Sequence, residues 1–215
     1  MPLEGRAKVD YQREYMRERR GREAKQRSLA LAVGHAQKVE VPEDAAECII
    51  DWCPNNLRVP NGRLQSAPFF LGDWQADWLR GAFAPGIFEA GLSVARKNGK
   101  SGVIAAALLC YLAGPLARPN WRAIVVSLTG ALAKELRDAI QLTALASGMN
   151  DDIRVWQSPT PGRIQGRYDS RVDFLAADKS SGHAVGADLA IIDEAGLLPE
   201  KKRCLLYTSP SPRDS

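Results

Sequence analysis

The sequence predicts an α/β protein in which a parallel sheet is flanked by helices. Three observations favour this fold class. From residue 87 onward, short apolar stretches alternate with helical stretches, which is the order expected of parallel strands joined by right-handed crossovers. The sequence Gly99 to Ser101 follows the first apolar stretch, and the last one ends in Asp193 and Glu194. Ligands of such sheets bind at the carboxyl ends of the strands, where both sequences are expected to lie.

Length and charge limit the classes of protein that fit. The chain has 215 residues, 45% of them hydrophobic, which suits one α/β domain and is short for two. Its net charge of +4 arises within residues 1–30, so a polyanionic partner elsewhere would have to be recognised by local patches. No apolar run approaches the ~20 residues of a membrane span, so we expect no membrane partner. Four cysteines without paired short spacings do not predict a zinc site.

Periodicity predicts the elements along the chain in order. Helices are expected at residues 43–53, 69–83, 101–115 and 129–148. Strands are expected at residues 87–95, 122–128, 153–158 and 170–177, and within the stretch DLAIIDEAG, residues 188–196. Asp73 is the expected N-cap of the second helix, and Thr129 and Gly148 are expected to bound the fourth.

The loop ARKNGKS, residues 95–101, has the features of a phosphate-binding loop, or P-loop. Between a strand and a helix, backbone N–H groups and the positive end of the helix dipole favour an anion. Lys100 can reach the outer phosphates of ATP, and the Ser101 hydroxyl can ligate Mg²⁺. Val94 stands where the ordinary motif has its first glycine, and a plain basic turn is the alternative for the loop taken alone.

The stretch LAIIDEAG, residues 189–196, predicts a buried strand followed by two acids. In a P-loop NTPase the first acid, here Asp193, holds Mg²⁺, and the second, Glu194, polarises the attacking water. Consecutive strand residues point to opposite sides, so both carboxylates can serve one site only if the chain turns after Asp193. A solvent-facing strand end is the alternative, and the co-occurrence with Gly-Lys-Ser favours the catalytic interpretation.

Gln75 is a candidate for adenine recognition. Its amide offers a donor and an acceptor, which match the N6 and N7 edge of adenine. Aromatic neighbours in FFLGDWQ could support the base. Taken alone, a polar residue on a Trp-rich helix is the simpler interpretation.

Residues 45–200 resemble the large terminase subunit of tailed bacteriophages, the ATPase that packages DNA into the procapsid. Residues 48–79 are similar to the adenine-binding Q motif of that family, and residues 95–101 resemble its Walker A variant, in which the early glycine is absent and an arginine follows the strand. Residues 125–136 look like a strand-to-helix segment shared with helicases, and residues 189–196 are similar to the Walker B strand. The resemblance implies a P-loop NTPase fold of the ASCE or RecA-like type.

The resemblance also implies a role for each residue of the site. Asp193 and Ser101 would bind Mg²⁺, and Glu194 would be the catalytic base. Lys100 and Arg96 would complete the catalytic set, with Arg96 sensing loss of the γ-phosphate. The residues implied to bind ATP are Gln75, Arg96, Lys97, Asn98, Gly99, Lys100 and Ser101. The candidates for an arginine finger that acts on a neighbouring subunit are Arg163, Arg167 and Arg171.

The same resemblance implies the partners and the place of action. These are double-stranded DNA, a small terminase subunit, a portal protein and further copies of the chain in a ring, in the cytoplasm of the infected bacterium. Two alternatives remain at this point. A superfamily 2 helicase shares the three motifs but keeps the early glycine that Val94 replaces. A non-catalytic phage protein would bind nucleic acid through its basic N-terminal arm.

Three segments of different character divide the chain. Residues 1–40 are a basic, charged arm with little apolar periodicity. Residues 41–203 hold the motifs and are expected to form the ATPase domain. Residues 204–215 differ in composition from everything before them and look like a translated sequencing adapter. We therefore expect the natural sequence to continue beyond Arg203, with the coupling motif and nuclease domain of the family, and the core sheet here to be incomplete at its C-terminus.

Overall fold

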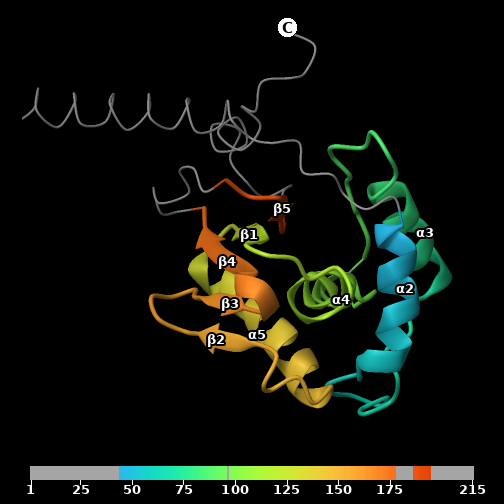
Figure 1. The fold of residues 1–215 in the computed structure, drawn as a ribbon, viewed down its shortest axis with the longest axis horizontal. Coiled ribbons are helices and arrows are strands. Elements are labelled where there is room, and N and C mark those ends of the chain that lie inside the picture. The colour runs from blue at the N-terminus through green and yellow to red at the C-terminus, as the bar shows by residue number, and fades with distance from the viewer. Residues whose placement is uncertain (1–43, 96, 178–185, 195–215) are drawn as a thin grey trace, which may run out of the picture. The chain divides into compact units, whose positions relative to one another are not determined.

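The computed structural model describes residues 44–95, 97–177 and 186–194 (Figure 1). Its helices are α2 (Ala45–Asn56), α3 (Asp73–Ala82), α4 (Lys100–Ala113), α5 (Gly130–Ala146) and the 3-10 turn η1 (Arg167–Asp169). Its strands are β1 (Arg122–Ser127), β2 (Arg154–Trp156), β3 (Arg163–Gln165), β4 (Arg171–Ala176) and β5 (Leu189–Ile192). The predicted segments 1–40 and 204–215 lie outside the described residues. No helix in the described ranges is long and apolar enough to cross a membrane.

The strands of the described part form one sheet in the order β2-β3-β4-β1-β5. Strand β1 lies between β4 and β5 and is parallel to both, as the alternating pattern predicted. The prediction of a wholly parallel sheet is wrong for β2 and β3, because β3 is antiparallel to both β4 and β2. The connections explain the difference. Residues 157–162 and 166–170 are too short to cross over, since a parallel connection needs roughly a dozen residues or more.

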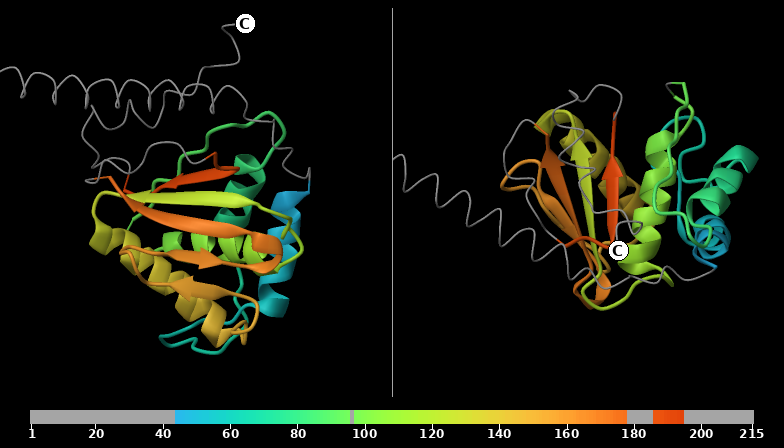
Figure 2. Two further views of the ribbon diagram at one scale, coloured as in Figure 1. Left: turned by 60° about the vertical axis from the view of Figure 1, so that its left-hand side comes forward. Right: turned by 90° about the horizontal axis from the view of Figure 1, so that it is seen from above.

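Among the described residues, helices lie on one face of the sheet only. In the left-hand view of Figure 2 the sheet faces the viewer, and the described helices lie behind it. Helix α5 packs on β1 and β4, α4 packs on α5, and α2 and α3 lie beyond α4. Strand β4 shows the alternation that this layering requires, because Val172, Phe174 and Ala176 are buried while Arg171 and Asp173 are less so. We call the side of the five strands on which no described helix packs the open face.

Helix α4 is the centre of the core. Every residue from Ala105 to Ala113 is buried, as expected of a helix that is apolar on all sides and is surrounded by other elements. Helix α2 adds Ile49 and Cys53 to the same cluster. Burying each large aliphatic side chain contributes about 1.5–3 kcal/mol, so α4 is anchored along its length. Its first residue, Lys100, is thereby fixed relative to the sheet.

The predicted strand at residues 87–95 is not formed. These residues have no strand assignment, and Phe88 is 85% exposed. A strand exists only where another strand supplies hydrogen bonds, and none of the described strands pairs with this segment. Its contact with the helical layer is a hydrogen bond from the Trp78 indole N–H to the Gly91 carbonyl, 3.0 Å long. The strand prediction is therefore wrong for these residues, because no described strand lies beside them to pair with.

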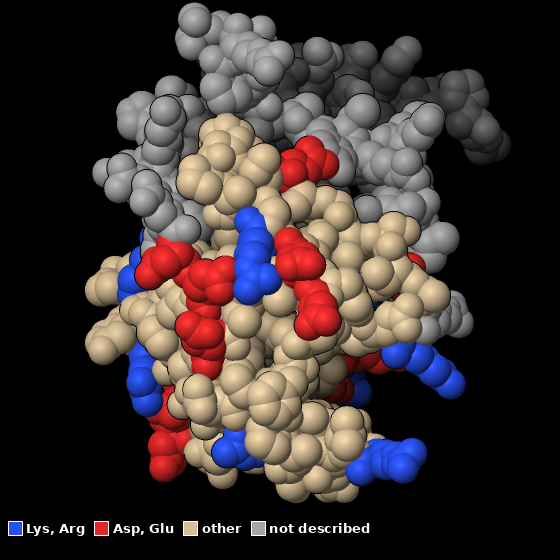
Figure 3. Space-filling view, turned by 90° about the vertical axis from the view of Figure 1, so that its right-hand side faces the viewer, with Lys and Arg blue, Asp and Glu red and all other residues tan. Residues whose placement is uncertain are grey.

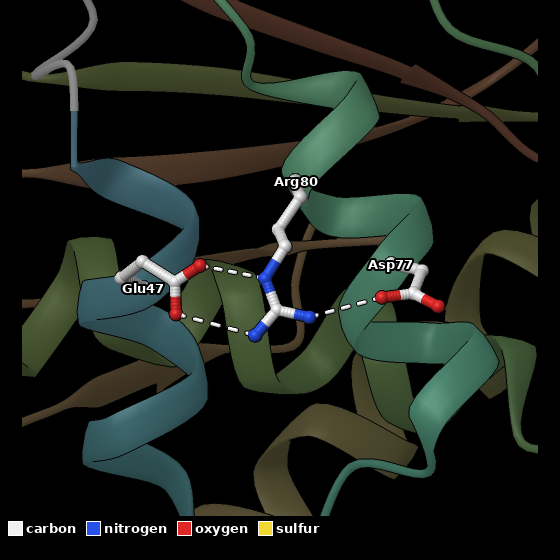
Figure 4. Close-up of polar contacts among 3 residues, drawn as sticks. All are labelled: Glu47, Asp77 and Arg80. Atoms are coloured by element: carbon white, nitrogen blue, oxygen red, sulfur yellow. Dashed lines mark hydrogen bonds and ion pairs between the residues drawn. The ribbon is translucent and has the colours of Figure 1, made fainter.

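Helices α2 and α3 are joined by an ion-pair cluster (Figure 4). The Arg80 guanidinium on α3 donates from Nε to Glu47 Oε1 on α2 at 2.6 Å and from Nη1 to Asp77 Oδ1 at 3.0 Å. The hydrogen bond from Arg80 lowers the pKa of Glu47, with a further contribution from its charge. This cluster helps to hold α3, which begins after Gly72 rather than after the predicted cap Asp73.

The surface of α2 and α3 is acidic. Figure 3 shows carboxylates gathered around a basic side chain on this side of the molecule. We call it the acidic face, and its exposed charged residues are Asp44, Glu47, Asp51, Asp73, Asp77 and Arg80. Five carboxylates and one guanidinium are therefore exposed on this face.

Candidate functional site

The predicted phosphate loop lies at the start of α4. Gly99 is the N-cap of this helix and has a φ of +80°, in the left-handed region that favours glycine. A Cβ atom at Gly99 would lie 2.7 Å from Gln75 Nε2, so the position also lacks space for a side chain. Lys97 has a φ of +69°, and the chain turns sharply between it and Lys100. Arg96 lies outside the described residues.

The two acids predicted from the last strand lie beside Lys100. Strand β5 ends at Ile192, and the Asp193 N–H donates to the Val126 carbonyl of β1 at 2.8 Å. Glu194 has a φ of +57° and makes the turn that the sequence required. Lys100 Nζ lies 2.8 Å from Asp193 Oδ1 and 3.2 Å from Glu194 Oε1. Both carboxylates therefore point to one cation, although they are consecutive in the chain.

The charges of this group are coupled. Partial burial alone would lower the pKa of Lys100, but its hydrogen bonds and charge interactions with Asp193 and Glu194 outweigh burial and raise it. Only 14% of the Asp193 side chain is exposed, against 44% of the Glu194 side chain. Lys100 thus compensates a carboxylate that is largely removed from water, which would otherwise be costly.

Gln75 connects the start of α3 to the phosphate loop. Its Oε1 accepts from the Gly72 N–H at 2.8 Å, and its Nε2 donates to the Asn98 carbonyl at 3.4 Å. The structure thus brings Gln75 into contact with the phosphate loop. Recognition of adenine by this amide stays a prediction.

The chain resembles known phage proteins in both sequence and structure. No protein-family model matches it. The large terminase subunit of Enterobacteria phage HK97 is 31% identical over 159 residues, which are 70% of this chain and 30% of that protein. The crystal structure of the HK97 bacteriophage large terminase has a TM-score of 0.63 and 25% identity, over 77% of this chain and 35% of that chain.

The chain belongs to the large terminase subunit family. It spans about a third of the length of these relatives. A Thermus phage P74-26 large terminase ATPase domain is less similar, with a TM-score of 0.35 and 16% identity over 48% of this chain and 47% of that one. The likeness to the HK97 terminase structure confirms the predicted α/β P-loop NTPase fold, with the mixed sheet described above.

The donor groups of the terminase site are suited to Mg²⁺ and ATP. Magnesium prefers hard oxygen ligands and in phosphate sites takes one or two carboxylates together with phosphate oxygens. Asp193 supplies a carboxylate beside Lys100, and Ser101 supplies an exposed hydroxyl in the first turn of α4. The space that a Cβ would fill at Gly99 lies against Gln75. These residues therefore fit the predicted ligands, while their individual roles stay predictions.

One polar group near the site, the Ser127 hydroxyl, was not predicted from the sequence. The Ser127 hydroxyl is fully buried and has no hydrogen-bond partner among the described residues. Ser127 ends β1, and its neighbour Val126 pairs with Ile192, the last residue of β5. A polar residue at the end of an otherwise apolar strand was the signal that could have found it.

The three candidates for an arginine finger lie apart from this cluster. Arg163 is on β3, and Arg171 begins β4 and pairs with Asp173 at 3.0 Å. Arg167 lies in η1 and pairs with Asp152 at 2.7 Å. Arg167 and Arg171 are thus at or before the amino end of β4, whereas Lys100 and the two acids are at the carboxyl ends of the parallel strands. The contacts given above bring none of the three to Lys100, Asp193 or Glu194, and their role as an arginine finger stays a prediction.

Proposed function

We propose that the chain is the ATP-hydrolysing motor part of a phage terminase, which moves double-stranded DNA into the procapsid. The observation that carries the proposal is the contact of Lys100 Nζ with both Asp193 and Glu194. It joins the phosphate loop to the strand-end acids, which are more than ninety residues away in the chain. P-loop ATPases need these three charged groups at one place.

Binding of ATP begins at the start of α4. Backbone N–H groups of residues 97–101 and the positive end of the α4 dipole receive the phosphates. Lys100 exchanges its carboxylate partners for the outer phosphate oxygens, which compete for the same ammonium group. Arg96 adds positive charge beside the γ-phosphate and senses its loss. Gln75, already attached to Asn98, links adenine recognition to the conformation of the loop.

Hydrolysis depends on the two acids that Lys100 releases. Mg²⁺, when held by Asp193 and Ser101, supplies charge neutralisation on the phosphates. Glu194 orients the attacking water and accepts its proton, and its exposure leaves it accessible to that water. Catalysis by such a site is mostly positioning and stabilisation of charge.

The partners follow from the family. The motor acts on double-stranded DNA together with a small terminase subunit and a portal protein, and copies of the chain form a ring. Its place of action is the cytoplasm of the infected bacterium.

The test is ATP hydrolysis by the Glu194→Gln variant, with Glu135→Gln on α5 as a control. Glu135 is also an exposed glutamate, on a helix that contributes none of the predicted site residues. We expect Glu194→Gln to bind ATP and to hydrolyse it at least about 100-fold more slowly, since a general base contributes this much or more. Normal hydrolysis by Glu194→Gln would contradict the assignment of the base. Normal ATP binding by Lys100→Ala would contradict the whole site and favour a non-catalytic protein.

A further inference from the structure

Two arginines lie against one tryptophan at the β2 and β3 end of the open face. The Arg163 guanidinium is 4.8 Å from the centre of the Trp156 ring, and the Arg154 guanidinium is 5.6 Å from it. Trp156 and Arg163 are cross-strand partners, and Arg154 precedes Trp156 by two residues on the same side of β2. Stacking on an aromatic ring fixes a guanidinium plane and leaves its N–H groups available to an acceptor. We call these three residues the Arg–Trp cluster.

No carboxylate neutralises the cluster in the part of the chain that the structure describes. Neither Arg154 nor Arg163 takes part in an ion pair there, and both are exposed. Asp173 is the cross-strand partner of Arg163, but its carboxylate pairs with Arg171 at 3.0 Å. Among the described residues, two exposed positive charges thus lie over one ring without a carboxylate partner.

The surroundings extend the positive charge. Arg122 and Arg171 are register partners on β1 and β4, and both are on the open face. The open side of β1 to β4 therefore carries four arginines and one aspartate. The acidic face, with five carboxylates and one arginine, is formed by helices beyond α4. A polyanion would therefore be attracted to the open face and repelled from the acidic face.

We propose that Arg154 and Arg163, stacked on Trp156, contact the phosphate backbone of double-stranded DNA. The proposal rests on the proposed function, because it names the surface with which the motor holds its DNA. Exposed guanidinium groups on a strand face suit regularly spaced phosphates better than a single buried anion. Contacts of this kind are independent of base sequence, as a motor that moves along a genome requires.

The test compares DNA binding by the 215-residue chain and by its Arg154→Ala/Arg163→Ala variant. Fluorescence anisotropy with a mixed-sequence duplex of about 30 base pairs gives the affinity between about 50 and 200 mM salt. We expect the slope of log affinity against log salt to become shallower by about 2, because each lost phosphate contact removes about 0.9 from it. Raising the salt over this range should therefore reduce the affinity of the unchanged chain by a factor about 12 times larger than that of the variant. The variant should also bind DNA more weakly at the low-salt end.

Two further variants separate charge from stacking. Arg63→Ala/Lys134→Ala removes the same charge from exposed positions outside the open face and should leave the salt slope nearly unchanged. Trp156→Leu keeps both arginines but removes the ring on which they stack, so it should weaken binding while Trp156→Phe restores most of it. An equal loss in the control pair, an unchanged slope in the cluster pair, or no DNA binding by the unchanged chain would each overturn the proposal.

ATP hydrolysis without DNA, measured on the same samples, separates this proposal from the proposed function. If the unchanged chain hydrolyses ATP and the cluster variant keeps its DNA affinity, only the DNA surface is wrong. If no sample hydrolyses ATP, the proposed function fails whatever the salt slopes are. A loss of hydrolysis in Arg163→Ala that depends on protein concentration, with DNA binding intact, would assign Arg163 to a neighbour's nucleotide and overturn the DNA contact.

Discussion

The acidic face and the open face use arginine in opposite ways. On the acidic face, Arg80 forms ion pairs with Glu47 and Asp77. Its pair with Glu47 joins helix α3 to helix α2. On the open face, Arg154 and Arg163 lie against an indole and have no carboxylate partner among the described residues. Residues 31–215 contain as many basic as acidic residues, so the net charge conceals this separation. The comparison shows that the layer in which a charge lies determines its role more than the total charge does.

Reversing the charge of the Arg–Trp cluster should have the largest effect on this comparison. We expect Arg154→Glu/Arg163→Glu to weaken binding of duplex DNA by about 100-fold, because it removes two phosphate contacts and adds two like charges. Anisotropy titrations at constant salt measure the change. The corresponding alanine pair should lie between this variant and the unchanged chain, and a ranking in any other order would argue against a direct phosphate contact.

The nucleotide site should respond to loss of Lys100 even without nucleotide. Lys100→Met leaves Asp193 largely buried without its cation, and we expect a loss of about 1–3 kcal/mol in the free energy of unfolding. Urea unfolding at neutral pH measures it. Because the pKa of Lys100 is raised, this stabilisation is present below the ordinary pKa of lysine and is lost as the pH rises through the higher folded value. The double variant Lys100→Met/Asp193→Asn should recover part of the loss.

Neutralising the acidic face should change DNA binding only slightly. We expect Asp44→Asn/Asp51→Asn to raise DNA affinity by no more than about threefold, since these exposed charges lie on helices beyond α4 and are screened by salt over about 8–10 Å. The same anisotropy titration measures it. If this variant gained as much DNA affinity as the alanine variant of the Arg–Trp cluster loses, DNA would have to contact the acidic face. The contrast between the two faces would then be wrong.

The Arg80 cluster should give the smallest effect. Arg80→Ala removes exposed ion pairs, which contribute little to stability, so we expect a small decrease in Tm at neutral pH that high salt reduces. The pKa of Glu47 is lowered, so its contribution is present above the ordinary pKa of glutamate and is lost as the pH falls through the lower folded value. Thermal melts of Arg80→Ala and the unchanged chain should therefore converge in acid. A difference that persists at the lowest pH would instead indicate lost packing of the arginine stem.

The convergence of the two chemical motifs was predicted because parallel strands bring their carboxyl ends to the same edge of a sheet. Asp193 and Glu194 do follow such a strand end. The strand expected before Gly99 and Lys100 is not formed, so the buried helix α4, rather than a strand, holds Lys100 at this edge. The actual contact between the two motifs needed two further features, the left-handed Gly99 and the turn at Glu194. The residue types allow both conformations, but only the packed chain selects them.

Other features could not be predicted because they depend on neighbours far away in the chain. Residues 87–95 have a strand-like apolar pattern, yet they form no strand without a partner among those described. Strand β3 was missed because Arg163 to Gln165 contains one buried apolar residue, Ile164, which is too short a pattern for periodicity to detect. The Arg–Trp cluster depends on the pairing of β2 with β3, and nothing local relates Arg154 to Arg163.

The sequence by itself determined the local elements and the chemistry available to the chain. Apolar periodicity, caps and the Gly-Lys-Ser and Asp-Glu pairs are encoded within a few residues, and each limits what its own segment can do. Only the tertiary structure decided which groups meet and which face each charge occupies. It placed Lys100 against both acids and separated the arginines of the open face from the carboxylates of α2 and α3. The physical reason is that strand order and helix layering arise from long-range pairing and burial, and a local pattern carries no information about its distant partner.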